Sequence, residues 1–246
     1  MYLSRLSLNP SSRIVRRDLA NCHQLHSRVL SAFSTTPSGD ESARAKFSVL
    51  HRIDVNPHTG RIILLVQSVE PPDWSSLPPD YLAAWDGADP SEVNPAVKNV
   101  QDLYALIQND LLLTFRLRAN PTKKKSQKSD RLAGGPNKNG KRIPLIRDET
   151  LIAWLARKGQ DGGFALETVR VSKDVPDARA SPEGNITGKK PSKGAAGSTA
   201  TLTFRSILFE GHLRVTDRDR FLATLQSGIG SGKAYGFGLL SVAPAR

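Results

Sequence analysis

The chain has 246 residues, and its 35 Lys and Arg residues against 23 Asp and Glu give a formal charge of +12 at pH 7. A hydrophobic content of 38% excludes a wholly disordered chain, because it is enough to build packed cores. The longest purely apolar run, residues 62–66, is far shorter than the ~18 residues that a membrane-spanning helix needs. So positive a charge predicts a polyanionic partner, with nucleic acid ahead of an anionic membrane surface.

The chain contains a single cysteine, Cys22, so no disulfide can form within it. This favours a reducing, cytoplasmic location. The length allows either one large domain or two small ones.

The first half of the chain alternates between strand-like and helix-like patterns. A hairpin is predicted where two strands flank the Asn-Pro-His-Thr-Gly turn at 56–60. Six prolines between residues 71 and 95 break any long element, so the second helix is expected to be short. The predicted elements, in order, are strand 2–8, helix 12–33, strands 46–54 and 61–69, helix 80–85 and strand 96–100.

The second half repeats this order with clearer signals. One helix is predicted at 148–158, with Asp148 as its cap and Gly159 at its C-terminus. A second helix is predicted to start after Thr216 as N-cap, with Asp219 completing a capping box. The predicted strands are 111–118, 164–171, 202–215 and 237–242.

Both halves follow the order βαββαβ, which is typical of the ferredoxin-like or RRM-like unit. We therefore predict an α+β protein of two tandem ferredoxin-like domains, the N-terminal one less regular. The expected domains are residues 1–105 and 106–246. They share the order of their elements but no sequence-level repeat.

Positive charge is concentrated between residues 121 and 147, where nine basic residues accompany one acid, Asp130. Glycine, proline and asparagine at 134–140 resist regular structure, so we expect a loop. A second loop with three lysines, at 189, 190 and 193, is expected at 174–198. Because a basic cluster repels itself unless an anion neutralises it, the sequence predicts phosphate binding. The nine basic residues are Lys123, Lys124, Lys125, Lys128, Arg131, Lys138, Lys141, Arg142 and Arg147.

Residues 21–33 form a helical motif with two histidines. Asn21 is expected to cap the helix. On a helical wheel His26 falls within the apolar arc, and His23 lies at its edge. A histidine in such an arc is more often a packing residue, yet imidazole also suits acid–base catalysis near neutral pH. A metal site of Cys22 with both histidines is disfavoured, because the helix offers no fourth ligand.

The last motif is a glycine-rich run at 228–242, GIGSGKAYGFGLLSV. Its order of residues fits neither a Walker loop nor a dinucleotide-binding loop. An ordinary helix-to-strand connection needs one or two glycines, whereas five, beside Lys233, favour close approach of the backbone to a sugar-phosphate. The five are Gly228, Gly230, Gly232, Gly236 and Gly238.

Several of these segments resemble the CRISPR repeat-processing endoribonucleases of type I-E systems, the CasE family. The glycine-rich run is the most specific of them, and residues 71–100 and 124–200 match weakly. The matching segments are LSLNP at 6–10, RRDLAN at 16–21, His26, FRLRANPTK at 115–123, LFEGHLRV at 208–215 and the run at 228–242.

The resemblance implies metal-independent cleavage of CRISPR precursor RNA, with no cofactor, at the 3′ base of the repeat hairpin. The mature guide RNA stays bound, and other Cascade subunits become partners; no membrane is involved. His26 matches the family's catalytic histidine and is expected to act as general acid or base. The residues expected to bind RNA are Arg28, Lys123, Lys124, Lys125, Lys128, Lys141, Arg142, Gly228, Gly230, Gly232 and Lys233.

The motif departs from the family pattern at two places. Many relatives carry a tyrosine where this chain has His23, so His23 either shares the acid and base roles with His26 or only binds phosphate. Relatives often place arginine directly after the histidine, whereas here Arg28 lies about 200° around the helix. Lys233 or a lysine at 123–125 is then an alternative stabiliser of the transition state. The alternative function is a non-catalytic RNA-binding module of the same fold.

Overall fold

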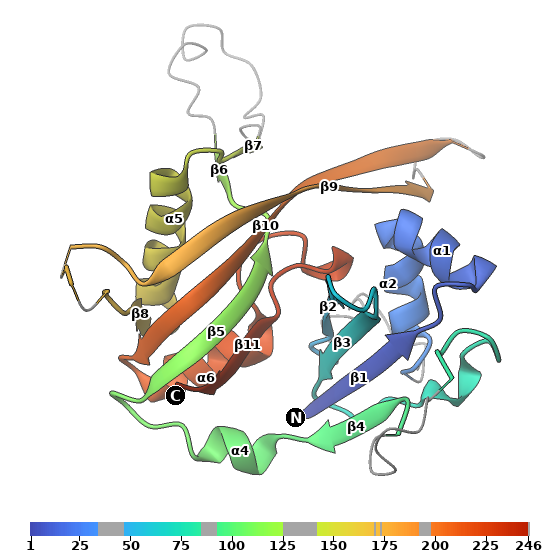
Figure 1. Ribbon diagram of the computed structural model, residues 1–246, viewed down its shortest axis with the longest axis horizontal. Coiled ribbons are helices and arrows are strands. Elements are labelled where there is room, and N and C mark those ends of the chain that lie inside the picture. Colours follow the sequence, from blue (N-terminus) through green and yellow to red (C-terminus); the bar gives the residue numbers. More distant parts are fainter. Residues whose placement is uncertain are drawn as a thin grey trace, which may run out of the picture.

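The computed structural model describes residues 1–33, 47–84, 93–124, 142–169, 171–172, 174–191 and 198–245. Within these ranges the chain forms two main antiparallel sheets, each with its own helices, that lie side by side (Figure 1). No helix in the described ranges is long and apolar enough to cross a membrane.

The N-terminal sheet has the strand order β2-β3-β1-β4, and all its neighbours are antiparallel. The predicted hairpin is confirmed, since Val55 pairs with Ile62 across the turn. An order in which the second and fourth strands of the chain lie at the edges is that of a ferredoxin-like domain. The strands are β1 (Tyr2–Leu8), β2 (Leu50–Val55), β3 (Ile62–Ser68) and β4 (Ala96–Asn99).

Two helices, α1 (Arg13–Ala20) and α2 (Cys22–Leu30), occupy the region predicted as one. They part at Asn21, whose backbone is extended. The predicted cap is confirmed, because the Asn21 side chain accepts a hydrogen bond from the His23 backbone N–H at 3.1 Å. Buried side chains of both helices, Val29 among them, complete the N-terminal core.

The second helix predicted for this domain, at 80–85, is absent from the described residues 80–84. Tyr81 is fully buried there, and Leu82 forms a bridge to Leu8 at the end of β1. The nearby helical turn is a short 3₁₀ turn, η1 (Trp74–Ser76). The prediction was wrong because pairing with β1, next to prolines that donate no hydrogen bond, favours extended backbone.

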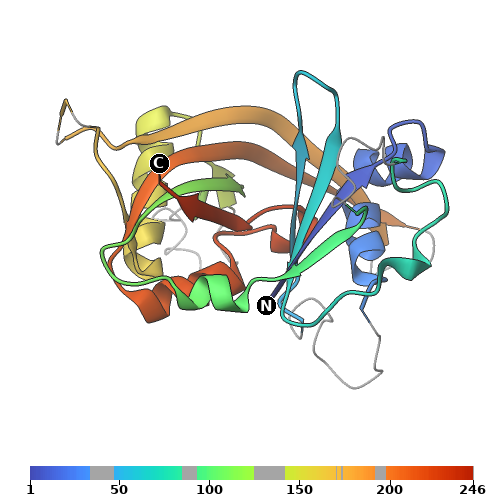
Figure 2. The same cartoon turned by 60° about the horizontal axis from the view of Figure 1, so that its bottom comes forward.

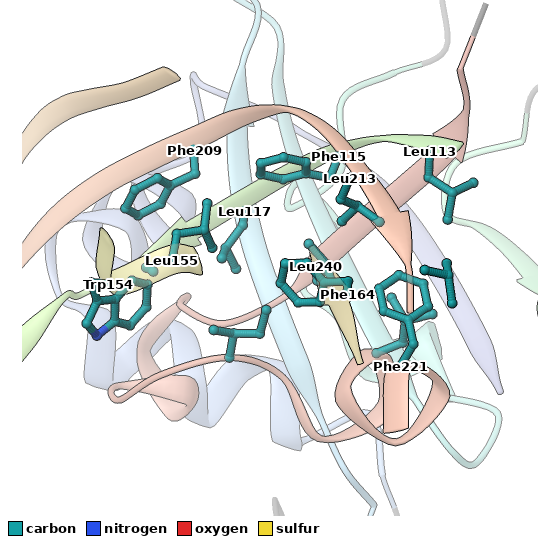
Figure 3. Packing of buried hydrophobic residues seen from close by; sticks show 14 of the residues in the cluster. Leu113, Phe115, Leu117, Trp154, Leu155, Phe164, Phe209, Leu213, Phe221 and Leu240 are labelled. Atoms are coloured by element: carbon teal, nitrogen blue, oxygen red, sulfur yellow. The ribbon is translucent and has the colours of Figure 1, made fainter. Parts of the chain in front are cut away.

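The C-terminal sheet has the order β11-β5-β10-β8, the same arrangement as the first sheet, and β9 also pairs with β10. Figure 3 shows how Trp154 and Leu155 of one helix and Phe221 of the other pack with strand residues such as Leu117 and Phe209. The predicted class of two ferredoxin-like domains is confirmed. The elements are β5 (Leu112–Ala119), α5 (Asp148–Gly162), β8 (Phe164–Leu166), β9 (Ala178–Pro191), β10 (Thr199–Val215), α6 (Arg218–Ser227) and β11 (Leu240–Pro244).

The helix boundaries in this domain differ from the prediction. Helix α5 continues past Gly159 and ends at Gly162, where the following Gly163 caps it with a φ of 78°. Gly159 instead serves packing, since a Cβ there would lie 2.5 Å from the Phe164 carbonyl oxygen. Helix α6 is capped by Asp217 rather than by Thr216. A glycine can end a helix or permit close packing, and neighbouring small polar residues can both act as caps. The residue types alone therefore misplaced the C-terminus of α5 and the N-terminus of α6.

The loop predicted at 174–198 was largely wrong, because most of its described residues form β9. Strand β8 also ends earlier than the predicted 164–171. The β9–β10 hairpin extends beyond the C-terminal core and reaches over α1 and α2 (Figures 1 and 2). Its side chains are mostly exposed and polar, so pairing with β10, and not an alternating pattern, makes it a strand.

The predicted basic loop is described only at its ends, which pair as β6 (Thr122–Lys124) and β7 (Arg142–Pro144). Its residues 125–141 lie outside the described residues. Between the two sheets runs α4 (Gln101–Ala105). The division at residues 105 and 106 stays a prediction.

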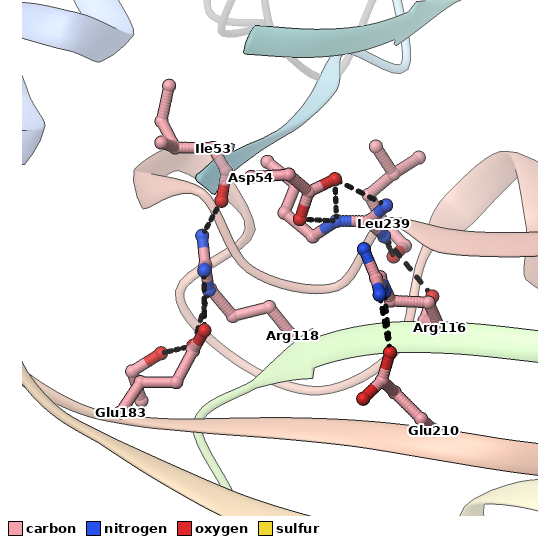
Figure 4. Close-up of polar contacts among 9 residues, drawn as sticks. Ile53, Asp54, Arg116, Arg118, Glu183, Glu210 and Leu239 are labelled. Atoms are coloured by element: carbon pink, nitrogen blue, oxygen red, sulfur yellow. Dashed lines mark hydrogen bonds and ion pairs between the residues drawn. The ribbon is translucent and has the colours of Figure 1, made fainter. Parts of the chain in front are cut away.

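Arginine side chains join the two domains (Figure 4). Arg52 of β2 is buried and donates to the carbonyl oxygens of Arg116 at 3.2 Å and Leu239 at 3.3 Å. In the other direction, Arg118 of β5 donates to the Ile53 carbonyl oxygen. These reciprocal contacts hold β2 against the C-terminal sheet, and this contact positions the site described next.

Candidate active site

Two histidines of α2, His23 and His26, lie half-buried at the contact between the domains. Tyr235 of the 3₁₀ turn η2 (Lys233–Tyr235) packs against both. Its ring centroid is 5.8 Å from that of His26, in an edge-on arrangement, and 6.5 Å from that of His23. Burial, with a smaller effect of the Cys22 thiol, raises the pKa of Tyr235, so its phenol stays neutral at physiological pH.

Helix α2 is held in place by β9. The Asn21 side chain accepts a hydrogen bond from the Lys189 backbone N–H at 3.1 Å and donates to the Lys189 carbonyl at 3.4 Å. The preceding Gly188 permits this approach, because a Cβ there would lie 2.7 Å from Cys22 Sγ. The extended hairpin of the C-terminal domain therefore fixes the N-terminus of the helix that carries both histidines.

A third imidazole, His51 of β2, lies behind His26. It is 1% exposed, its ring centroid is 6.5 Å from that of His26, and the two planes differ by 15°. Burial, helped by the positive charges of His26 and Arg118, lowers the pKa of His51 to about 3. No sequence motif marks His51, and the sequence-based reasoning missed it.

The glycine run connects α6 to β11 and adopts a conformation that suits its composition. All five glycines have positive φ values between 75° and 89°. At Gly228 a Cβ would also lie 2.8 Å from the Gly238 carbonyl oxygen and 2.8 Å from Cδ1 of Leu50 in the other domain. The run therefore folds back on itself and packs on β2. Its predicted contact with a sugar-phosphate stays a prediction.

A basic cleft of about 790 Å³ opens between β6, β7, α5 and the glycine run. It brings together six of the residues predicted to bind RNA: Lys123, Lys124, Arg142, Gly228, Gly230 and Lys233. Helix α5 adds Arg157 and Lys158, which sequence reasoning did not select. The available signal was their position three and four residues after the buried Trp154, since this spacing places them one helical turn further along the same face.

Turn η2 borders both the basic cleft and the two histidines of α2. Lys233, its first residue, lines the basic cleft, and Tyr235, its last, contacts His26. The cleft and the histidines are thus adjacent parts of one surface at the domain contact.

The remaining residues predicted to bind RNA do not line the basic cleft or lie outside the described residues. Arg28 pairs with the buried Asp18, with Nε 3.0 Å from Oδ2, and lies over the Tyr81 ring. The structure does not bring it to the cleft, and Gly232 does not line the cleft either. Lys125, Lys128 and Lys141 lie outside the described residues.

Among the described residues, no group of three or more His, Cys, Asp or Glu side chains is placed to hold a metal ion. Histidines in a half-buried site suit proton transfer, and the lysines and arginines beside them suit binding of phosphate. Fold and site together define a class: two-domain ferredoxin-like proteins with a basic cleft next to half-buried histidines.

Within that class, the chain belongs to the family whose model is described as "CRISPR associated protein", which matches residues 1–244. It is 36% identical over 251 residues to the CRISPR-associated endoribonuclease Cse3 of Thermus thermophilus, covering 99% of this chain and 100% of the relative. It is 30% identical over 244 residues to the Cascade subunit CasE of Escherichia coli, with the same coverage. The resemblance found in the sequence is confirmed.

The solved structures agree. Thermus thermophilus Cse3 bound to an RNA representing a pre-cleavage complex is similar to this chain with a TM-score of 0.72 and 31% identity. That match covers 99% of this chain and 98% of the other. The similarity therefore spans both domains and the contact between them.

Proposed function

We propose that this chain is a site-specific endoribonuclease that cuts CRISPR precursor RNA at the 3′ base of the repeat hairpin. It keeps the mature guide RNA bound and joins other Cascade subunits. The family and the names of its relatives support this function. The structural observation that carries it is turn η2, which places Lys233 in the basic cleft and Tyr235 against His26.

The hairpin stem binds along the basic cleft. Double-stranded RNA is recognised mostly through its backbone and shape, which suits a cleft of exposed cations and glycine backbone. Lys123 and Lys124 on β6 and Arg142 on β7 contact phosphates, with Arg157 and Lys158 on the facing helix. Lys125, Lys128 and Lys141 extend this surface in the proposal.

The chemistry is attack of the 2′-OH preceding the scissile phosphate on the phosphorus. The P–O5′ bond breaks, leaving a 2′,3′-cyclic phosphate on one product and a 5′-OH on the other; hydrolysis of the cyclic phosphate by one water molecule then gives a 3′-phosphate. One proton leaves the 2′-oxygen and one reaches the 5′-oxygen, so two transfers need groups with pKa values near ambient pH. His26 performs one of them, and His23 either performs the other or binds the phosphate. Lys233 supplies positive charge as negative charge grows on the phosphate oxygens.

We place this protein in the cytoplasm. The single cysteine, Cys22, is buried as a free thiol, which agrees with a reducing compartment.

The test is incubation of the purified protein with an end-labelled repeat hairpin in EDTA, with a His26→Ala preparation as the control for contaminating nucleases. We expect one cut and a downstream fragment with a 5′-OH, which polynucleotide kinase labels without prior phosphatase treatment. Tight binding with no cleavage in any buffer would establish the non-catalytic RNA-binding module instead. Cleavage that requires Mg²⁺ would refute the proposed chemistry.

A further inference from the structure

His51 is a buried polar side chain whose ring nitrogens have no hydrogen-bond partner among the described residues. The ring is 1% exposed. A buried donor or acceptor left unsatisfied destabilises the folded state, whereas an apolar side chain of similar shape would not. Stability therefore does not explain why a histidine stands at this position of β2.

The surroundings of His51 direct it towards His26. On one side the glycine run closes over it, and a Cβ at Gly236 would lie 3.6 Å from His51 Nε2. On the other side His26 presents a nearly parallel ring, with 6.5 Å between centroids. Because ring atoms lie only about 1.2 Å from each centroid, the closest nitrogens of the two rings are at least about 4 Å apart, too far for a direct hydrogen bond. A single water molecule bridges two nitrogens about 5 Å apart, a distance above this lower limit.

His51 stays neutral near physiological pH, whereas His26 must gain and lose a proton in the proposed reaction. The charged groups that act on it are His26 on α2 and Arg118 on β5, and both disfavour a proton on His51. A neutral imidazole donates from one nitrogen and accepts at the other, so it can pair with a partner in either protonation state. A lysine or carboxylate in the same place would favour one charge state of His26.

We propose that His51 is a positioning residue that orients the His26 imidazole through one bridging water. Whichever nitrogen of a catalytic histidine faces the substrate, a bond to the other fixes the ring and its tautomer. His51 has this role for His26 from the buried side of the site. The inference rests on the proposed cleavage by His26.

The first test compares His51→Phe with the parent protein in single-turnover cleavage and RNA binding. Phenylalanine keeps a ring and removes both nitrogens. We expect cleavage to slow at least tenfold at saturating enzyme, RNA affinity to stay within twofold, and the melting temperature to be equal or higher. A folded His51→Phe protein that cleaves at the parental rate would overturn the proposal.

A second pair of variants keeps the test decisive if phenylalanine does not fit beside Gly236. His51→Asn places an amide near the position of Nδ1, the nitrogen on the edge of the ring away from Gly236, and His51→Leu has similar size but no polar atom. We expect the asparagine variant to retain at least tenfold more activity than the leucine variant at equal stability. Equal rates for the two would contradict a role in hydrogen bonding.

His26→Ala in the same assay separates the two proposals. If it cleaves like the parent, the proposed function of His26 fails. If it is inactive while His51→Phe is fully active, only the inference about His51 fails.

Discussion

The two domains share one strand order but are built and used differently. The N-terminal domain lacks the second helix in its described part and carries all three imidazoles of the site, two on α2 and one on β2. The C-terminal sheet has both helices, a larger core, the basic cleft and the hairpin that reaches over α2. In the proposed function, the N-terminal domain supplies the groups for proton transfer and the C-terminal domain supplies most of the RNA-binding surface.

The largest expected effect is on the cleavage rate and tests whether the N-terminal domain supplies the catalytic histidine. His26→Ala should lower single-turnover cleavage about 10³-fold, since a positioned acid or base contributes roughly 10²–10⁴-fold. RNA affinity should change less than threefold, as measured by filter binding. Gln24→Ala, an exposed change on the same helix, is the matched control and should cleave normally. If His26→Ala lost RNA affinity as much as cleavage rate, the assignment of catalysis to one domain and binding to the other would be wrong.

The next effect is a pH dependence of stability that arises at the domain contact. The folded-state pKa of His51 is about 3, below its ordinary value of 6.5, so between these values the unfolded chain binds the extra proton. Stability should therefore fall as the pH drops below 6.5, by about 2 kcal/mol from pH 6.5 to pH 5. Urea unfolding at both values measures it, and His51→Phe should lack this part of the difference. An identical pH dependence in both proteins would contradict the burial of a neutral His51.

A smaller effect is expected on RNA affinity and tests whether the basic cleft of the C-terminal domain binds the hairpin. Lys123 and Lys124, both replaced by Ala, should weaken binding of the repeat hairpin about tenfold and reduce the salt slope by about 2. Cleavage at saturating enzyme should be nearly unchanged. Arg61 and Lys98, exposed basic residues of the N-terminal domain, provide a charge-matched double variant that should leave the slope within one unit of the parental value. Equal losses in both variants would show that net charge, not the cleft, drives binding.

The smallest expected effect is on the cleavage rate and comes from the contact between β9 and α2. Gly188→Ala should push β9 away from α2 and slow cleavage about threefold, because the new Cβ would overlap Cys22 Sγ and the Asn21 side chain. RNA affinity should hold, since the cleft lies elsewhere. Thr187→Ala, an exposed neighbour on the same strand, serves as the control. Cleavage at the parental rate in a folded Gly188→Ala protein would mean that β9 does not position the histidines.

Much of the fold was predictable because its signals are local. The hairpin at 56–60 and the cap at Asn21 depend on residues a few positions apart, and both predictions are confirmed. Strand β9 was missed because its exposed side chains lack alternation, and only its pairing with β10 defines it. The helix at 80–85 failed for a related reason, since Leu82 bridges to Leu8, more than seventy residues away.

Local sequence signals were enough to predict most of the strands and helices, the concentration of positive charge and the two histidines on one helix. These follow from periodicity, capping and composition, which act over a few residues. The tertiary structure alone decided that Tyr235 and His51 flank His26, that Arg157 joins the cleft, and that Arg28 is engaged by Asp18. These contacts join residues far apart in the chain, and they form only because Arg52, Arg118 and the glycine run dock one sheet against the other.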